Sequence, residues 1–144
     1  MQRRKGFTLV ELVVVVMILG ILAAVAVPKL VSTTGNATDN GLRQTVGVVR
    51  DAIELYASQN GGALPGADGT EATFKANLKP FLRGDFPKCP IGAKNNLVKF
   101  TTTAGAIAGE ASPTQGWHYN NKDGGFIANN TTMSNDGVNT YDKF

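Results

Sequence analysis

Three residues near the start of this chain have the types and spacing to support chemistry: Gly6, Phe7 and Glu11. Gly6 has no side chain, so a protease can approach its backbone closely. A cut between Gly6 and Phe7 would create a new α-amino group on Phe7. Glu11 follows four positions later, about one helical turn, so that amino group could neutralise its carboxylate in the same chain or in a neighbouring one. The spacing therefore predicts a processing site coupled to a docking charge.

The segment that contains these residues is long and apolar enough to cross a membrane. Phe7 to Val27 is a nearly continuous apolar run. As a helix it would span about 31 Å, which matches a hydrocarbon core of roughly 30 Å. The cations Arg3 to Lys5 precede it, and cations on that side predict a cytoplasmic N-terminus and an exported remainder.

Two simpler interpretations compete with the processing site. A cleaved secretory signal would use Ala24-Val25-Ala26 as its small-residue cleavage pattern, but the apolar run is longer than usual and holds a carboxylate. A plain signal anchor explains length and orientation. It leaves Glu11 unpaired, at a cost of about 2.5–3.5 kcal/mol at the bilayer centre and less near the interface. Cleavage after Gly6 gives this carboxylate a partner.

Gly6-Phe7-Thr8-Leu9-Val10-Glu11-Leu12, with the apolar run and Pro28 after it, closely resembles the class III signal of type IV pilins and type II secretion pseudopilins. In that family a prepilin peptidase cuts after the glycine and methylates the new N-terminal phenylalanine, and the glutamate guides subunit docking in a helical filament. The resemblance implies that Gly6 is the last leader residue, Phe7 the methylated N-terminus and Glu11 the assembly carboxylate.

These observations divide the chain into three expected parts: a leader at 1–6, a transmembrane and assembly helix at 7–31, and an exported head at 32–144. Two glycines and several cap-prone residues make Val31 to Gly41 a poor helix segment, so we expect helix with local irregularity there. From residue 42 an amphipathic stripe resumes and should face the core of the head: Leu42, Val46, Val49, Ile53 and Tyr56. Arg43, Arg50, Asp51 and Glu54 are expected on the opposite face, with Arg50 and Glu54 spaced to pair.

The rest of the head predicts short elements. Asn60-Gly61-Gly62 should end the long helix, and Asp68-Gly69-Thr70 can cap a second one. Strand patterns cover Leu97–Thr103, Gly116–Tyr119 and Gly125–Ala128, the last two joined as a hairpin. The expected fold class is α+β and pilin-like: a long N-terminal helix packed on a small antiparallel sheet of about three strands.

The charge balance argues against a nucleic-acid partner. The chain carries a net charge of +3, which equals the contribution of Arg3, Arg4 and Lys5, so the remainder is balanced and has no basic stripe. Its one cysteine, Cys89, rules out an intramolecular disulfide, and we expect it to be buried as a small hydrophobe.

No enzyme is expected from the head. His118 is the only histidine and lacks the orienting partner and nucleophile that a catalytic base needs. We expect no cofactor. The resemblance makes calcium a candidate ligand, because some pseudopilins bind it in a loop of the head. The oxygen-rich groups that could bind it here are Asp123 with Asn121, and Asp136 with Asn135 and Asn139. Neither group matches an EF-hand loop.

The expected function is that of a structural subunit in a helical filament anchored in the inner membrane, the pseudopilus of a type II secretion-like system that acts in protein export. The implied partners are other copies and related pilins, the prepilin peptidase and the inner-membrane assembly platform. The head would be periplasmic. Gly116-Trp117-His118-Tyr119 stands where the major pseudopilin has an Asp-x-Trp-Gly pattern, so a type IV pilus or DNA-uptake subunit is the alternative. A monomeric membrane-anchored binding module and an exported enzyme are the other classes that we considered.

Overall fold

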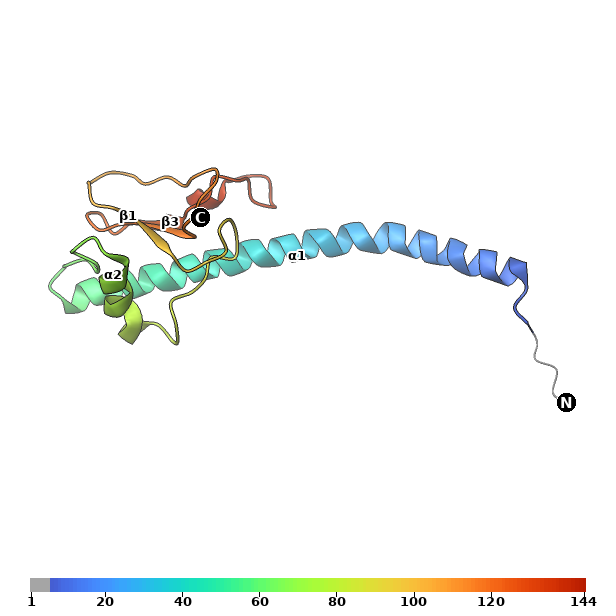
Figure 1. Ribbon diagram of the computed structural model, residues 1–144, viewed down its shortest axis with the longest axis horizontal. Helices are drawn as coiled ribbons and strands as arrows, with labels where there is room; N and C mark the ends of the chain where they lie inside the picture. The colour runs from blue at the N-terminus through green and yellow to red at the C-terminus, as the bar shows by residue number, and fades with distance from the viewer. Residues whose placement is uncertain (1–5) are drawn as a thin grey trace. The chain divides into compact units, whose positions relative to one another are not determined.

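The computed structural model describes residues 6–144, which form parts of two compact units, one ending at Gly35 and the other comprising Asn36–Phe144. Helix α1, Leu9–Gln59, belongs to both units, and the second unit contains every other element (Figure 1). Those elements are α2 (Glu71–Leu78), the 3₁₀ turn η1 (Lys79–Phe81), β1 (Val98–Thr101), β2 (Trp117–Asn120), β3 (Phe126–Ala128) and the 3₁₀ turn η2 (Tyr141–Lys143). The expected α+β, pilin-like fold class is confirmed. The cations Arg3 to Lys5 lie outside the described residues.

Helix α1 continues through the segment in which we expected irregularity. Thr33 Oγ1 donates to the carbonyl oxygen of Lys29 at 2.8 Å, and Thr34 Oγ1 donates to that of Leu30 at 3.2 Å. These bonds let the hydroxyls return to the preceding turn of the same helix, so cap-prone side chains do not have to break it. The segment is helical as expected, but without the local irregularity that we expected there.

The glycines after α1 end it as the sequence predicts. Gly61 and Gly62 have φ values of 65° and 88°, the left-handed region that glycine enters without strain. Gly62 N donates to the carbonyl oxygen of Ala57 at 2.8 Å, and Asn60 Nδ2 donates to that of Tyr56 at 2.8 Å. The last carbonyl groups of the helix are thus satisfied as the chain turns away.

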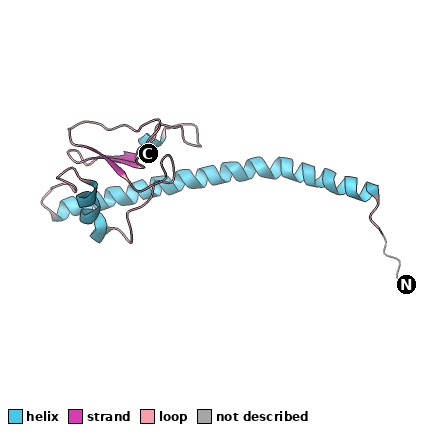
Figure 2. Cartoon of the chain, in the orientation of Figure 1, coloured by secondary structure: helices cyan, strands magenta, loops and turns pink. Residues whose placement is uncertain are grey.

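The sheet contains the three predicted strands but is mixed (Figure 2). Strands β2 and β3 are antiparallel, with Trp117 opposite Ala128, as the predicted hairpin requires. Strands β1 and β2 are parallel, with Val98 opposite Trp117, so the expectation of an all-antiparallel sheet was wrong. A tight turn forces antiparallel pairing, whereas the long connection between Thr101 and Trp117 leaves room for a crossover and a parallel partner.

The core of the second unit lies between α1 and the sheet. Leu42, Val46, Val49 and Ile53 are buried as predicted, and Tyr56 at the end of the stripe is partly buried. Aromatic rings from the sheet and α2 meet them, and Phe74 lies 4.3 Å from Tyr119 between ring centroids. Cys89 is buried in the same core as a free thiol, as expected.

Arg50 does not lie on the outer face of α1 as the spacing predicted. Its Nε donates to the carbonyl oxygen of Phe126 at 3.0 Å, and its Nη2 donates to that of Phe144 at 2.7 Å. A long guanidinium side chain can reach across from the edge of an apolar stripe, which periodicity alone does not reveal. Arg50 therefore ties the helix to both β3 and the last residue of the head.

Candidate functional site: the start of helix α1

The expected processing residues lie just before α1, outside any helix or strand. Gly6 and Phe7 precede the helix, and the Phe7 side chain is 86% exposed. A Cβ placed on Gly6 would meet no atom within 4 Å, so nothing in the described residues shields this peptide bond. A protease needs an accessible substrate, and residues 6–8 are exposed and lie outside helices and strands.

Thr8 and Glu11 form a capping box at the first turn. Thr8 N and Thr8 Oγ1 each donate to Glu11 Oε2 at 2.8 Å, and Glu11 N donates to Thr8 Oγ1 at 3.2 Å. The reciprocal bonds satisfy helix-terminal donors that otherwise lack partners. The sequence analysis predicts a docking role for Glu11 and does not predict this capping role of Glu11 and Thr8. The signal that could have found it is Thr8-Leu9-Val10-Glu11, a Ser/Thr-x-x-Glu pattern before an apolar run.

The first part of α1 leaves its apolar side chains exposed. An 18-residue stretch of α1 is apolar enough to cross a membrane, and none of it is buried within the fold. Leu9, Met17 and Leu30 illustrate this, with exposures of 78%, 63% and 65%. A contiguous apolar surface of this length marks contact with lipid or with other protein chains. A signal sequence near the N-terminus passes the same test of length and hydropathy, so the motif from Gly6 to Glu11 is needed to distinguish an assembly helix from a signal sequence.

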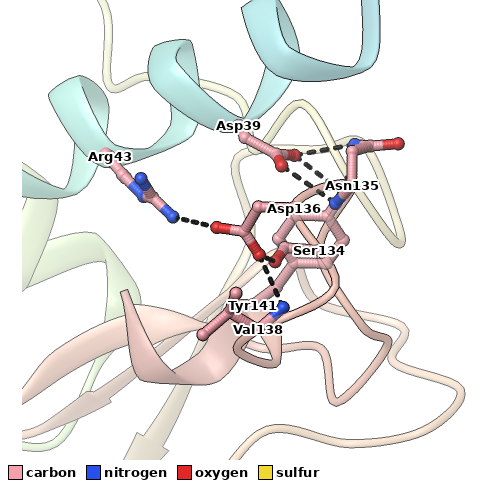
Figure 3. A network of polar contacts seen from close by, with 7 residues as sticks. All are labelled: Asp39, Arg43, Ser134, Asn135, Asp136, Val138 and Tyr141. Carbon is pink, nitrogen blue, oxygen red and sulfur yellow. Dashed lines mark hydrogen bonds and ion pairs between the residues drawn. The ribbon is translucent and has the colours of Figure 1, made fainter. Parts of the chain in front are cut away.

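A second polar cluster joins α1 to the C-terminal part of the head, and we call it the C-terminal latch. It is formed by Asp39 and Arg43 of α1 with Ser134, Asn135, Asp136 and Tyr141 (Figure 3). Asp39 is 3% exposed, and its carboxylate accepts bonds from Asn135 N at 2.9 Å, Asn135 Nδ2 at 2.8 Å and the Tyr141 hydroxyl at 3.0 Å. A buried carboxylate is stable only when it is well satisfied, and three donors meet that need.

The outer side of the latch is an ion pair. Arg43 Nη2 lies 2.7 Å from Asp136 Oδ2, and the Arg43 guanidinium also lies 4.1 Å from the ring centroid of Phe144. Ser134 Oγ and Val138 N donate to the other Asp136 oxygen. Hydrogen bonds from Ser134 and Val138, with that from Arg43, lower the pKa of Asp136 to about 2. The carboxylate is therefore ionised at any physiological pH.

Of the calcium candidates, Asp123 and Asp136 have carboxylate oxygens that accept hydrogen bonds within the protein, whereas Asn121 Oδ1 is buried without a hydrogen-bond partner among the described residues. Asp123 Oδ2 accepts from Gly105 N at 2.6 Å, whereas Asn121 Nδ2 donates to the carbonyl oxygen of Gly66 at 3.0 Å. The second candidate group belongs to the latch, where Asp136 faces Arg43. Among residues 6–144 there is no group of three or more His, Cys, Asp or Glu side chains that could hold a metal ion.

His118 is buried and uses both ring nitrogens inside the head. Nδ1 lies 2.9 Å from the carbonyl oxygen of Ala108 and so donates to it, which leaves Nε2 to accept from the Thr101 hydroxyl at 2.8 Å. Burial is the main cause that lowers the pKa of His118. The imidazole therefore connects β2 with β1 and with the 102–116 loop, and both of its nitrogens are bonded within the head.

Comparison with known proteins finds a family model and relatives that match this chain. Residues 1–27 match the prokaryotic N-terminal methylation motif. The chain is 34% identical over 114 residues to the type IV narrow pilus major component PilA5 of Thermus thermophilus, a match that covers 69% of this chain and 98% of the relative.

Two further relatives are matched over part of their length. The chain is 39% identical over 77 residues to type II secretion system core protein G of Pseudomonas aeruginosa, covering 52% of this chain and 54% of that protein. It is 31% identical over 105 residues to fimbrial protein EcpB of Eikenella corrodens, covering 73% and 62%. No solved structure matches the chain significantly.

Proposed function

This chain belongs to the type IV pilin and type II secretion pseudopilin family, and on that premise we propose that it is a subunit of a type II secretion-like pseudopilus that acts in protein export. The observation that carries the proposal is the unburied apolar stretch of α1 in a chain whose head has a buried core of its own. A chain with this distribution needs lipid before assembly and other apolar helices afterwards. Its role is structural and not enzymatic.

The maturation pathway follows from the first residues. A prepilin peptidase cuts the Gly6–Phe7 bond and methylates the amino group of Phe7, while the apolar part of α1 anchors the chain in the inner membrane. The N-terminus stays cytoplasmic and the head is periplasmic, because cations precede the anchor. An assembly platform in the same membrane then adds the subunit to the filament. The exposure of residues 6–8, which lie outside helices and strands, supports cleavage at this position.

The role of Glu11 changes during maturation. In the uncut chain the carboxylate accepts two bonds from Thr8. Cleavage adds a positive charge at Phe7, one turn away or on a neighbouring subunit. In an apolar surrounding a paired carboxylate is far more stable than a lone one, so this charge guides a new subunit to its place.

Two measurements test the maturation pathway. The mass of the mature N-terminus should correspond to N-methyl-Phe7, whereas a start at Val27 or Met1 would contradict processing at Gly6. Glu11→Val should insert into the membrane normally and fail to enter filaments. Filaments that form normally with Glu11→Val would show that the carboxylate has no docking role.

A type IV pilus is the second candidate, and one observation favours it. The match to the narrow pilus component covers 98% of that relative, whereas the match to secretion core protein G covers 54% of that protein. Deleting the gene separates the candidates. Loss of secreted proteins with surface pili intact supports the pseudopilus, and loss of pili with secretion intact supports the pilus.

A further inference from the structure

The ion pair of the C-terminal latch brings a positive charge to the loop at 131–140. Arg43 Nη2 lies 2.7 Å from Asp136 Oδ2, and Asp136 is the charged residue of that loop. Arg43 Cζ also lies 4.1 Å from the centroid of the Phe144 ring. A planar guanidinium can bind a carboxylate and stack on an aromatic ring at the same time. The cation is therefore fixed from two sides.

Helix α1 supplies both charged groups that hold this part of the chain (Figure 3). Asp39 and Arg43 are four residues apart in α1, so they lie on one face of the helix. The buried carboxylate of Asp39 accepts hydrogen bonds from Asn135 and Tyr141. Arg43 binds Asp136, the residue that follows Asn135. One turn of α1 therefore contacts the C-terminal segment at two neighbouring points, with a carboxylate at one and a guanidinium at the other.

The latch gathers hydrogen-bond donors, whereas a calcium site gathers oxygen ligands. Calcium takes about six to eight oxygens. All the carboxylate oxygens of Asp39 and Asp136 accept hydrogen bonds within the protein. Asn135 turns its amide nitrogen Nδ2 toward Asp39, where a metal ligand would turn its oxygen. The calcium candidate at Asp136, as it is arranged here, does not fit a metal ion.

We infer that Arg43 replaces calcium as the cation that neutralises Asp136 and fixes the loop at 131–140, so that the head closes without a metal. This inference concerns the head and goes beyond the proposed role in a filament. The guanidinium belongs to the chain and stays charged at any physiological pH, whereas a bound ion can be removed by a chelator. Because a ligand stabilises a fold only by binding to it, the stability of this head is independent of the calcium concentration.

A second ion pair of the head is a matched reference for this one. Lys99 Nζ lies 2.7 Å from Glu110 Oε1, the same separation as in the pair of the latch. The exposed fractions of the side chains are also similar, 36% for Lys99 and 39% for Glu110 against 46% for Arg43 and 34% for Asp136. An ordinary pair with this exposure contributes little to stability. Arg43 should contribute more, because it also stacks on Phe144.

Thermal unfolding of the full-length wild type in detergent tests the independence from calcium. The fluorescence of Trp117, which is fully buried, reports on the head. The two conditions are excess EGTA and about 10 mM calcium, a concentration above the dissociation constants of weak extracellular calcium sites. The melting temperature should be the same in both. A higher melting temperature in calcium would show that the folded head binds the ion, and would overturn the inference.

Two variants test whether Arg43 is the cation that matters. Arg43→Gln removes the charge and should lower the melting temperature in EGTA by about 4 °C, whereas Lys99→Gln should lower it by about 1 °C or less. Calcium should restore part of the loss in Arg43→Gln, because the latch then holds the carboxylates of Asp39 and Asp136 without a cation. It should not restore the loss in Lys99→Gln. Equal losses in EGTA, or no calcium response in Arg43→Gln, would each overturn the replacement of calcium by Arg43.

The measurement on the wild type stands if Arg43→Gln fails to fold. Arg43→Lys then serves as the second variant, because it keeps the charge and loses the planar fork that matches a carboxylate. It should fold, melt below the wild type and show no response to calcium, and a calcium response would contradict the inference. Failure of the proposed function is recognised separately, by a mature N-terminus that is not N-methyl-Phe7, and it does not affect these measurements.

Discussion

The Tyr141 hydroxyl donates a 3.0 Å hydrogen bond to the Asp39 carboxylate, although 102 positions separate the two residues in the chain. Burial, followed by the bond to Asp39, raises the pKa of Tyr141 to about 12, so the donor keeps its proton at physiological pH. Asp39 belongs to α1 and Tyr141 to η2. This bond therefore joins the long helix to the last segment of the head.

Breaking this connection should destabilise the head. Tyr141→Phe removes one donor and should cost about 1 kcal/mol, whereas Asp39→Ala leaves several buried donors without an acceptor and should cost about 3 kcal/mol. Denaturant unfolding of the full-length protein in detergent measures these changes in the free energy of unfolding. Trp117 is the only tryptophan and is fully buried, so its fluorescence reports on the head. Asp51→Ala, exposed on α1, should change stability by less than about 0.5 kcal/mol. Equal stability of Asp39→Ala and Asp51→Ala would contradict the role of the latch.

The capping and docking roles of Glu11 can be separated. Glu11→Gln preserves the capping box, because glutamine also bonds back to the N-cap residue, but it removes the charge. It should abolish incorporation into filaments. Thr8→Ala removes the cap, at a cost of about 1 kcal/mol, and keeps the charge, so filaments should still form. The measurement is the ratio of subunit in the filament fraction to subunit in the membrane fraction. The reverse pattern would mean that Glu11 acts by capping the helix.

His118 should make the stability of the head depend on pH. Its pKa in the folded head is lowered from 6.5 mainly by burial, with Lys99 lowering it further and Glu110 opposing. The unfolded chain therefore takes up the proton first as pH falls. The free energy of unfolding should be highest above pH 6.5 and should decrease below it, down to the folded pKa. The test is to measure the free energy of unfolding of wild type and His118→Gln between pH 5 and 8, about the range in which histidine titrates. An unchanged pH profile in His118→Gln would assign the dependence to other groups.

Gly116 should tolerate no side chain. A Cβ there would lie 2.5 Å from the carbonyl oxygen of Asn95 and 2.8 Å from Cys89 Cβ, so Gly116→Ala should cost about 1–3 kcal/mol through overpacking. Gly125→Ala is the control, because its Cβ would lie 3.7 Å from Ile107 Cδ1, an ordinary contact. Thermal unfolding of both variants compares them. Similar melting temperatures would show that the chain around Asn95 moves aside.

The parts that local patterns predicted correctly depend on neighbours in the sequence. The apolar stripe from Leu42 to Ile53, the end of α1 at Gly61 and the hairpin of β2 and β3 all follow from helix periodicity or turn chemistry. The predictions were wrong where a distant segment of the chain determines the local structure. The parallel pairing of β1 depends on the path of a long loop, and Arg50 turns inward because Phe126 and Phe144 present carbonyl oxygens to it.

The sequence by itself determined the family and the long helix, and it predicted the processing of Gly6 and Phe7 and the docking role of Glu11, because the motif and the apolar run are contiguous and need no tertiary contacts to be recognised. Tertiary structure alone decided the direction of β1, the inward position of Arg50 and the latch at Asp39. These features join residues that lie far apart in the chain. Their energies come from hydrogen bonds and buried surface that exist only after the head has folded.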